Sequence, residues 1–297
     1  MCLTRTLVKS FLPRRPKRAH KGIFGRVLIV AGSANMTGAG VLSARAVLQS
    51  GAGLVCLALP KSCQVVAAAA VPESLTLGLP EKNGVISERA VSVTEKFIKE
   101  FQPSVLLIGP GLAKSPFIIP FLKRNKLPAV IDADALNALA REKNFEQILH
   151  KFRVICTPHP GEMERLLKYK INSDQTVRVQ AAQQLSKHTQ GVSVLKGFET
   201  VITDGKITYI NPTGSTALAK AGSGDVLAGI IAGLWAQLGV AEGYYDAATA
   251  LKAAAAGVYL HGLCGDLAAR QLSDRAVLAS DVAAQLPGAW KRVLRAR

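Results

Sequence analysis

Short runs of apolar residues alternate with longer amphipathic segments along most of this sequence. The runs are rich in Val, Ile and Leu and are continuously apolar, which is typical of strands buried on both faces. They cover Val27 to Ala31, Leu54 to Leu59, Val105 to Ile108, Ala129 to Ile131, Arg153 to Cys156 and Ser193 to Leu195. The segments between them predict helices at Val41 to Gln49, Ser87 to Phe101, Phe117 to Arg124, Ala135 to Arg141 and Thr176 to Thr189. This order predicts a three-layer α/β fold, with helices on both faces of a mostly parallel sheet.

The pattern changes in the last third of the chain. Two short strand-like runs between Thr200 and Ile210 flank Asp204-Gly205, a dipeptide that favours a tight type I′ turn, so the sheet is expected to end in an antiparallel hairpin. From Ser223 to about Arg270 the pattern is helical, with Ala and Gly at many positions that would let helices approach the sheet closely. No change in composition suggests a second domain. Residues 20–297 are therefore expected to form one domain, preceded by a basic arm of residues 1–19.

Composition narrows the class of protein. The 297 residues are 49% hydrophobic and 19% charged, which is typical of a soluble globular protein. The longest near-apolar stretch, Val226 to Ala241, is shorter than the roughly 20 residues that cross a bilayer, so we expect a buried helix and no membrane partner. The five cysteines are scattered and contain no Cys-x-x-Cys pair. This argues against a disulfide framework or a zinc site and favours a cytoplasmic protein.

The formal charge of +17 is concentrated at the start of the chain, where no Asp or Glu precedes Glu73. Residues 1–19 are expected to form a flexible basic arm; an organellar transit peptide is the alternative, although Pro13 and Pro16 interrupt a continuous amphipathic helix. Basicity can indicate nucleic-acid binding or a phosphate-rich small substrate. Aromatic residues make up only 5% and no stacking motif accompanies the basic ones, so we expect the small substrate and no nucleic-acid partner.

Unusual loop residues follow the expected strands. Ligands of open parallel sheets bind at the carboxyl ends of the strands, in the loops that lead to the next helix. Those loops contain Gly32-Ser33, Gly109-Pro110-Gly111, Asp132-Ala133-Asp134, Thr157-Pro158-His159-Pro160-Gly161-Glu162 and Lys196-Gly197. Five such loops along one sheet edge predict a binding crevice there.

The segment Gly222-Ser223-Gly224-Asp225 comes directly before a helix-patterned segment, Val226 to Gln237. Glycines at a helix start let backbone N–H groups converge on an anion, and the positive end of the helix dipole adds to the attraction for phosphate. Ser223 and Asp225 could instead simply cap the helix. A carboxylate beside a phosphate site can accept the proton of an attacking hydroxyl, which favours phosphoryl transfer with Asp225 as the base.

Nine motifs occur in the order found in the NAD(P)H-hydrate dehydratase family, which the chain resembles over residues 20 to about 290. They are His20-Lys21-Gly22 with Gly25, Ala31-Gly32-Ser33, Gly38-Ala39-Gly40, Gly109-Pro110-Gly111-Leu112, Asp132-Ala133-Asp134-Ala135-Leu136-Asn137, Thr157-Pro158-His159-Pro160-Gly161-Glu162, Leu195-Lys196-Gly197, Asn211-Pro212-Thr213-Gly214, and Gly222-Ser223-Gly224-Asp225 with Leu227-Ala228-Gly229. One motif could arise by chance, but the ordered set is specific. The resemblance implies a ribokinase-like fold and an ATP- or ADP-dependent reaction on the S form of NADHX or NADPHX, in which water has added across the C5–C6 bond of the reduced nicotinamide ring.

The resemblance also implies roles for individual residues. The hydrated dinucleotide would contact Ala39, Gly111, His159 and Asp225, and the adenine nucleotide would be held by Gly224 and by Lys196, Gly197, Phe198, Glu199 and Thr200. Asp225 would deprotonate the ring hydroxyl, while an anion hole of Gly222, Ser223 and Gly224 would stabilise the transferring phosphoryl group. Loss of phosphate would then restore NADH or NADPH. Mg²⁺ would bridge the nucleotide phosphates, and no protein ligand is assigned to it.

Four positions depart from the family pattern. Ser223 stands where Thr is usual, Ala221 where Gly is usual and Gly40 where Ala is common, and Ala113 takes the place of Gly after the Gly-Pro-Gly-Leu run. The change to Ser223 keeps the hydroxyl. Ala221 has the larger expected effect, because a Cβ there could hinder a backbone angle that glycine permits.

Several side chains in these loops also have a structural interpretation. His159, between two prolines, could only fix the shape of a turn. Asp132 and Asp134 could cap the following helix, with Asp134 the better placed N-cap, or they could contact phosphates or magnesium. Lys196 is expected to contact the nucleotide, because a lone Lys-Gly at the end of a buried strand otherwise leaves its charge unpaired.

Other classes of protein compete with this interpretation. The sequence contains no Walker P-loop string, and the loop after the first strand lacks the glycine spacing of a dinucleotide fingerprint, so a hydride-transferring Rossmann enzyme is disfavoured. A ribokinase-like kinase of a vitamin precursor or sugar would share the fold and the Asp base. The Thr157-to-Glu162 string together with Lys196-Gly197 argues against it. A non-catalytic nucleotide sensor is disfavoured by the intact Asp225.

Partners follow from the same resemblance. We expect a homo-oligomer that acts on NADHX or NADPHX with an adenine nucleotide. No epimerase domain is fused to these residues, so a separate NAD(P)HX epimerase is expected to interconvert the R and S hydrates. The choice between ADP and ATP, and between NADHX and NADPHX, stays open at this point.

Overall fold

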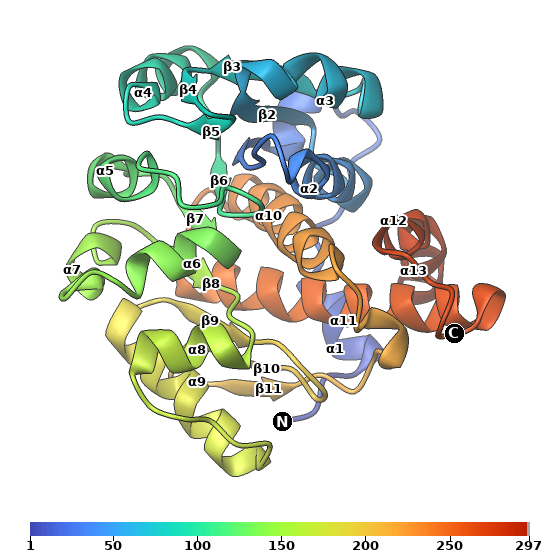
Figure 1. The fold of residues 1–297 in the computed structure, drawn as a ribbon. Coiled ribbons are helices and arrows are strands. Elements are labelled where there is room, and N and C mark those ends of the chain that lie inside the picture. Colours follow the sequence, from blue (N-terminus) through green and yellow to red (C-terminus); the bar gives the residue numbers. More distant parts are fainter. Residues whose placement is uncertain (296–297) are drawn as a thin grey trace.

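The computed structural model describes residues 1–295 and arranges them around a central sheet (Figure 1). Within these residues the main sheet has nine strands in the order β11-β10-β9-β8-β7-β6-β1-β2-β3. Its strands are β1 (Arg26–Val30), β2 (Leu54–Pro60), β3 (Leu75–Leu79), β6 (Val105–Ile108), β7 (Ala129–Ile131), β8 (Val154–Cys156), β9 (Val192–Leu195), β10 (Val201–Thr203) and β11 (Thr208–Ile210). Neighbouring strands are parallel except where β10 pairs with β9 and β11. The predicted mostly parallel sheet with an antiparallel edge hairpin is confirmed.

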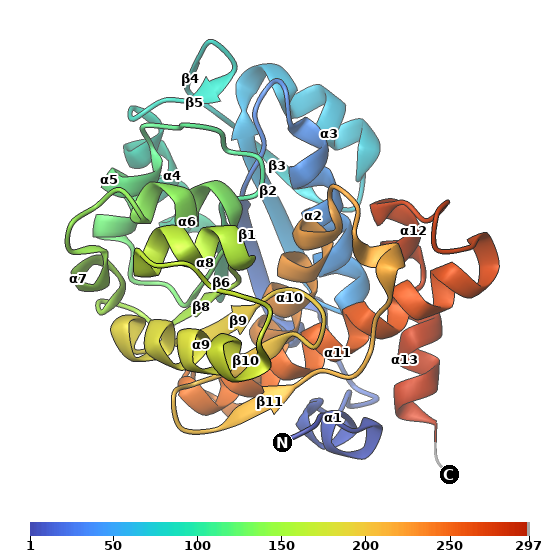
Figure 2. The same cartoon turned by 60° about the horizontal axis from the view of Figure 1, so that its bottom comes forward.

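Helices cover both faces of this sheet (Figure 2). One face packs against α2 (Thr37–Ser50), α3 (Gln64–Ala70), α10 (Ser223–Glu242), α11 (Ala247–Leu272), α12 (Ala279–Ala284) and α13 (Leu286–Leu294). The other packs against α4 (Ala90–Phe101), α5 (Ile118–Arg124), α6 (Ala133–Leu139), α7 (Phe145–Leu149), α8 (Pro160–Leu167) and α9 (Gln175–Thr189). Val27 and Ile29 face the first group and Leu28 and Val30 the second, all fully buried. Burial on both sides explains the continuous apolar runs.

Edge elements of the sheet differ from the prediction. The strand β3 and a small hairpin of β4 (Glu81–Lys82) and β5 (Val85–Ile86) were not predicted, because their residues are mostly half-exposed and mix polar with apolar types. The β10–β11 hairpin turns over four residues, Asp204 to Ile207. Gly205 has a φ of 87°, but Asp204 does not have positive φ, so the type I′ turn prediction is wrong. The Asp204 carboxylate accepts hydrogen bonds from the amides of Lys206 (2.9 Å) and Ile207 (2.7 Å), which stabilises the wider loop.

The helix α10 lies at the centre of the molecule and packs closely on α2. It begins three residues before the predicted Val226. A Cβ on Gly229 would lie 2.5 Å from the Ser43 carbonyl oxygen, and one on Gly233 would lie 1.9 Å from Ser50 Oγ. By length and hydropathy α10 could cross a membrane, but 78% of its apolar window is buried inside the protein. It is the buried core helix that the sequence predicted, and its glycines allow the close helix contact.

The first 12 residues are packed, so the expectation of a flexible arm is wrong for them. The Leu3 amide donates to the Ile210 carbonyl (2.9 Å), which joins the chain start to β11. The helix α1 (Arg5–Phe11) packs against α11 and α13 and buries Val8 completely. Apolar residues at positions 3, 7, 8 and 11 make this contact. They are spaced as on one face of a helix, but basic residues dominate this segment and the helix was not predicted.

Candidate active site

The carboxyl ends of β6, β7, β8 and β9 meet the start of α10 at one edge of the sheet. Backbone hydrogen bonds continue the strand pairing into the loops: the Asp132 amide donates to Ile108 (3.1 Å), the Thr157 amide to Ile131 (3.1 Å) and the Lys196 amide to Pro158 (2.9 Å). These backbone bonds continue the strand pairing beyond the strand ends, so they fix the positions of the loop residues relative to one another. The loops predicted to line a crevice are thus brought together.

Asp132 is the centre of a buried polar network. Its side chain is 2% exposed, and its Oδ1 accepts hydrogen bonds from Thr157 Oγ1 (2.8 Å) and Lys196 Nζ (2.7 Å). Lys196 Nζ also lies 3.7 Å from Glu162 Oε2. Each of these residues comes from the end of a different strand or from the helix that follows it. Sequence reasoning assigned Asp132 no definite role, because nothing in its local pattern identifies its two partners.

The charge of Lys196 is paired inside the protein by Asp132 and Glu162. The prediction that it would be unpaired without a nucleotide is therefore wrong. Burial lowers the pKa of Lys196, but the carboxylates of Asp132 and Glu162 outweigh burial and raise it above the ordinary value. The ammonium group is therefore charged at neutral pH. A Cβ placed on Gly224 would lie 3.5 Å from Lys196 Nζ and 4.0 Å from Asp132 Oδ2, so the network lies directly against the start of α10.

His159 and Glu162 form a capping box at the start of α8. The Glu162 amide donates to His159 Nδ1 (3.3 Å), and the His159 amide donates to Glu162 Oε2 (2.8 Å). Burial and the positive charges of Lys196 and Arg165 lower the pKa of His159, so the ring is neutral and its 3.4 Å contact with Glu162 is not an ion pair. Burial raises the pKa of Glu162 against the opposing effect of Lys196. The His159 side chain is 50% exposed, so it remains accessible while it caps the helix.

Asp225 lies in the first turn of α10, partly buried beside this network. Burial, followed by the negative charge of Asp132, raises the pKa of Asp225 to about 7, while Lys196 acts in the opposite direction. The charges that act on the Asp225 carboxyl group are therefore those of this cluster. A general base acts best when its pKa is close to the working pH, and Asp225 meets that condition.

The start of α10 offers backbone donors next to Asp225. Within residues 1–295, the amides of Gly222, Gly224 and Asp225 donate no hydrogen bond, whereas the Ser223 amide donates to the Lys220 carbonyl (3.3 Å). Gly222 has a φ of 86°, a backbone conformation that favours glycine. Two of the three residues predicted for the anion hole therefore have free amides, and Asp225 supplies a third. Free amides at the positive end of a helix dipole are a site for phosphate.

The Ser223 side chain forms a hydrogen bond with a buried histidine, His261, whose contact sequence reasoning did not predict. Its Oγ lies 3.1 Å from His261 Nε2, and both side chains are buried. Burial lowers the pKa of His261 to about 4, so the ring is neutral. His261 lies in the middle of α11, 38 residues from Ser223 in sequence. A lone His in an Ala-rich helical segment carries no signal of that contact.

The remaining predicted residues lie around the same edge. A Cβ on Gly111, which has a φ of 62°, would lie 2.8 Å from the Ala39 Cβ, so these two residues are adjacent. The loop after β9 contains Gly197 and Thr200, whose hydroxyl donates to the Gly197 carbonyl (2.8 Å). Phe198 in that loop is 86% exposed. A flat, exposed aromatic ring two residues after Lys196 is suited to contact an adenine ring.

Two expectations about local geometry are corrected. Ala221 does not have positive φ, whereas Ala113 does, at 55°. The strained replacement of glycine is therefore at Ala113 and not at Ala221. Asp134 is not the N-cap of α6; Asp132 occupies that position without a side-chain capping bond, and Asp134 Oδ2 accepts a hydrogen bond from the Ala113 amide (2.8 Å).

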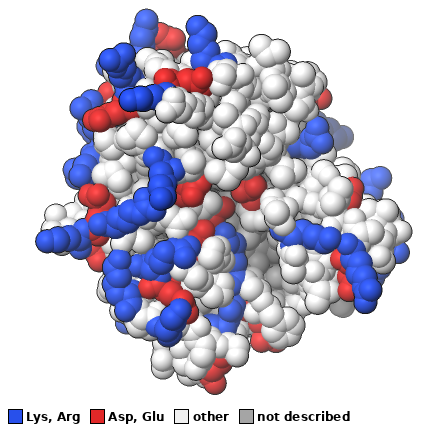
Figure 3. Space-filling view, viewed as in Figure 1, with Lys and Arg blue, Asp and Glu red and all other residues white. Residues whose placement is uncertain are grey.

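Charged side chains are unevenly distributed over this face of the molecule (Figure 3). Acidic groups gather near its centre, while Lys and Arg side chains flank them on the side of α6, α7 and α8. The buried network supplies carboxylates from Asp132, Glu162 and Asp225 around one ammonium group, that of Lys196. The central cluster is thus acidic, and the basic groups lie beside it.

The three-layer fold, with Asp225 and free helix amides at the carboxyl edge of the sheet, places the chain among the ribokinase-like proteins. It superposes with a TM-score of 0.79 on a ribokinase-like superfamily protein from Enterococcus faecalis V583, at 27% identity and covering 98% of this chain and 95% of that one. The crystal structure of the ADP/ATP-dependent NAD(P)H-hydrate dehydratase from Bacillus subtilis, co-crystallized with ATP and Mg²⁺, gives a TM-score of 0.81 at 30% identity and 98% coverage of both chains. The NAD(P)H-hydrate dehydratase family model matches residues 27–288. The chain belongs to that family, which confirms the resemblance and the predicted fold.

Curated relatives agree with this assignment. The bifunctional NAD(P)H-hydrate repair enzyme of Moorella thermoacetica is 45% identical over 292 residues, which are 96% of this chain and 53% of the relative. The ADP-dependent (S)-NAD(P)H-hydrate dehydratase of Bacillus subtilis is 32% identical over 290 residues, which are 96% of each protein. The chain spans about half the length of the bifunctional relatives that it matches.

Proposed function

We propose that this chain dehydrates the S forms of NADHX and NADPHX to NADH and NADPH, with ADP or ATP as phosphoryl donor. The observation that carries the proposal is Asp225, a carboxyl group with a pKa of about 7 next to three free backbone amides. Family membership over residues 27–288 supplies the substrate class. In this proposal the dinucleotide binds beside Ala39, Gly111 and His159, and the adenine nucleotide binds beside the loop from Lys196 to Thr200.

The reaction divides into two steps at this site. Asp225 accepts the proton of the ring hydroxyl while the hydroxyl oxygen attacks the terminal phosphoryl group of the nucleotide and displaces the shortened nucleotide. The free amides of Gly222, Gly224 and Asp225 stabilise the charge on the transferring group. In the second step the C–O bond breaks and phosphate leaves with the bonding electron pair, while the neighbouring ring carbon loses a proton to water, which restores the double bond. Phosphate is a far better leaving group than hydroxide, and this is the reason for using a nucleotide.

A magnesium ion fits the oxygen groups of this site. Within residues 1–295 no three His, Cys, Asp or Glu side chains are grouped as a cage for a metal. Mg²⁺ usually needs only one or two carboxylates, with the nucleotide phosphates and water as its other ligands. Asp132 Oδ2, which takes part in no hydrogen bond within the described chain, and the Asp225 carboxylate would hold its water ligands. The ion would neutralise phosphate charge when bound.

The test is an activity matrix of two donors and two substrates. Purified protein is mixed with ADP or ATP and with S-NADHX or S-NADPHX, and both inorganic phosphate and the absorbance of the reduced nicotinamide ring are followed. Equal amounts of phosphate and restored reduced ring are expected. Absence of both products with every pair would contradict the proposal. An epimerase that interconverts R and S hydrates is the proposed partner, because the reaction uses one epimer.

A kinase that releases a stable phosphorylated product is the alternative function. The hydroxyethylthiazole kinase of Pyrococcus horikoshii shares the fold with a TM-score of 0.57, but at 12% identity this likeness concerns the fold alone. With a vitamin precursor or sugar in place of the hydrate, a kinase would accumulate the phosphorylated compound and release no phosphate. The two functions therefore differ in one measured product.

A further inference from the structure

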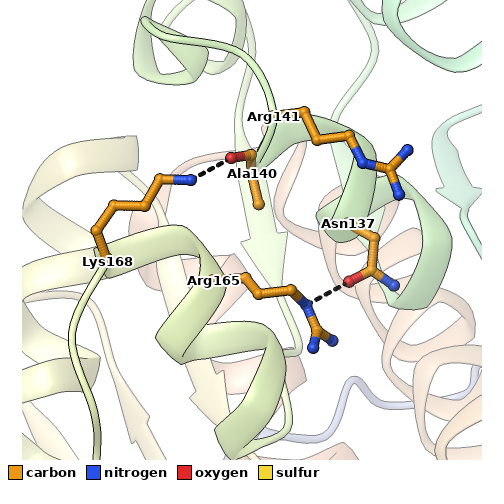
Figure 4. A pocket seen from close by; sticks show the side chains of 5 residues that line it. All are labelled: Asn137, Ala140, Arg141, Arg165 and Lys168. Atoms are coloured by element: carbon orange, nitrogen blue, oxygen red, sulfur yellow. Dashed lines mark hydrogen bonds between the residues drawn. The ribbon is translucent and has the colours of Figure 1, made fainter.

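A pocket of about 550 Å³ lies between α6 and α8, outside the network around Asp225 (Figure 4). It is lined by Asn137, Ala140, Arg141, Arg165 and Lys168. Three of these five residues are cations, and no carboxylate lines the pocket. A volume of this size is within the range of small-molecule sites, and its lining is suited to an anion.

The cations of this pocket are positioned but not neutralised. Arg165 Nε donates to Asn137 Oδ1 (2.9 Å), and Lys168 Nζ donates to the Ala140 carbonyl. Figure 4 shows the guanidinium groups of Arg141 and Arg165 on either side of Asn137. Within residues 1–295 the Arg141 side chain makes no hydrogen bond or ion pair, which leaves all of its donors free. The pocket therefore contains three positive charges without a counter-charge of its own.

Carboxylates close to these cations in sequence are engaged elsewhere. Glu142 pairs with Lys123 (3.4 Å) and Glu164 with Lys170 (3.1 Å). Glu162 is buried against Lys196 and the start of α8. The positive field of the pocket is thus directed to solvent, where it can attract a ligand.

The pocket adjoins the proposed dinucleotide site through α8. A Cβ placed on Gly161 would lie 3.1 Å from His159 Cε1 and 3.7 Å from Arg165 Nη1, so imidazole and guanidinium flank the same glycine. Lys168 lies one helical turn beyond Arg165, roughly 4.5 Å further along the axis. A ligand that touches His159 can therefore reach the pocket with its other end.

We infer that this pocket binds the 2′-phosphate of the dinucleotide and makes the enzyme prefer NADPHX to NADHX. The inference rests on the proposed function and names the substrate within it. A phosphate monoester carries close to two negative charges and three acceptor oxygens, and arginine matches it with two parallel hydrogen bonds. The pyrophosphate bridge, by contrast, is common to both substrates and would create no preference. NADHX lacks the 2′-phosphate and would leave the three cations without a counter-charge.

The experiment uses a double variant that carries both Arg141→Gln and Arg165→Gln. The single variant Arg270→Gln is the control. Arg270 is an exposed arginine on α11, so its replacement removes one charge away from the pocket. In the double variant we expect the KM for S-NADPHX to rise about 10- to 100-fold, the size expected for charge-assisted hydrogen bonds. The KM for S-NADHX and kcat for both substrates are expected to change less than about three-fold. The control is expected to keep the preference of the unaltered protein.

A binding measurement separates this inference from the proposed function. Calorimetry with adenosine 2′,5′-bisphosphate and with adenosine 5′-monophosphate should show tighter binding of the bisphosphate to the unaltered protein, and no such difference in the double variant. Equal losses for both substrates, no loss for either, or an unchanged preference for the bisphosphate would overturn the inference. If the protein turns over neither hydrate, the proposed function fails and the calorimetric difference still decides the role of the pocket.

Discussion

Two neighbouring groups of charged residues are held in opposite ways in this molecule. In the active site the side chains of Asp132, Glu162 and Lys196 are 2%, 5% and 17% exposed, and each is paired. In the pocket between α6 and α8, the side chains of Arg141, Arg165 and Lys168 are exposed to solvent and form no ion pair with the described residues. Burial fixes the first group in one arrangement around Asp225. Exposure leaves the second group free to meet a ligand.

Substitutions in these two groups should have different effects on the free energy of unfolding. Removing one partner of a buried ion pair leaves an uncompensated charge in a region of low dielectric constant, whereas water screens an exposed charge. Substitutions in the buried network should therefore change both stability and catalysis. Substitutions in the pocket should change ligand affinity with little effect on stability.

The largest effect is expected from Asp225→Asn. Loss of the general base should lower kcat about 100- to 10,000-fold and leave nucleotide binding nearly unchanged, because the side chains are similar in shape. In the unaltered protein kcat/KM should rise as the pH rises through about 7, since the base acts in its ionised form. Steady-state kinetics across pH and calorimetric nucleotide binding measure both. Near-normal turnover by the variant would contradict the assigned role.

The same variant should be more stable than the unaltered protein above pH 7. The folded-state pKa of Asp225 is raised to about 7 from 3.8, so its ionisation disfavours the folded state. The penalty is complete above pH 7 and disappears as the pH falls toward the unfolded-state value. Thermal melts of both proteins at several pH values check this sign. A variant that melts lower at pH 8 would show that the Asp225 carboxylate stabilises the fold.

The second largest effect concerns the buried pair. Lys196→Met should lower the free energy of unfolding by about 3–5 kcal/mol, because Asp132 is left buried without its counter-charge. Arg141→Gln in the pocket should change it by less than about 0.5 kcal/mol. Urea unfolding of both variants gives the two values. Asp132→Asn combined with Lys196→Met should recover part of the loss, and strictly additive losses would refute the pairing.

A smaller effect is expected from the loss of the hydrogen bond between Ser223, at the start of α10, and His261 of α11. His261→Ala removes the partner of the Ser223 hydroxyl and should cost about 1–3 kcal/mol of stability. It should also lower kcat more than it raises KM, because the start of α10 loses its support. His261→Gln can place an amide where Nε2 lies and should restore much of kcat. If Gln and Ala behave alike in kcat, His261 only fills space.

The smallest effect is expected at Ala113, in the loop after β6. Its φ of 55° strains an alanine, so Ala113→Gly should raise the free energy of unfolding by about 0.5–1 kcal/mol, the strain released less the entropy that glycine adds to the unfolded chain. The hydrogen bond from its amide to Asp134 should be kept. Ala221→Gly is the matched control and should destabilise slightly, since Ala221 does not have positive φ. Equal shifts in thermal melting for the two variants would contradict this.

Much of the fold could be predicted because it is encoded locally. Continuous apolar runs predicted the core strands, and Asp204-Gly205 predicted the hairpin though not its turn, which the Asp204 carboxylate widens. The start of the chain was predicted to be flexible because its few apolar residues are stabilised only by packing against α11 and α13, which are distant in sequence. In the site, Asp225 and the glycines before it were recognisable as a helix start. His261 and the central role of Asp132 were not.

By itself the sequence determined the order of strands and helices, the edge of the sheet where the candidate site lies, and Asp225 with its neighbouring amides, because these depend on residue type and short spacing. Only the tertiary structure decided which charges meet. Asp132 and Lys196 are 64 residues apart, and Ser223 and His261 are 38 apart. The pKa of Asp225 depends on burial and on those distant charges together. Electrostatic interactions act through space, so their effects emerge once packing has set the distances.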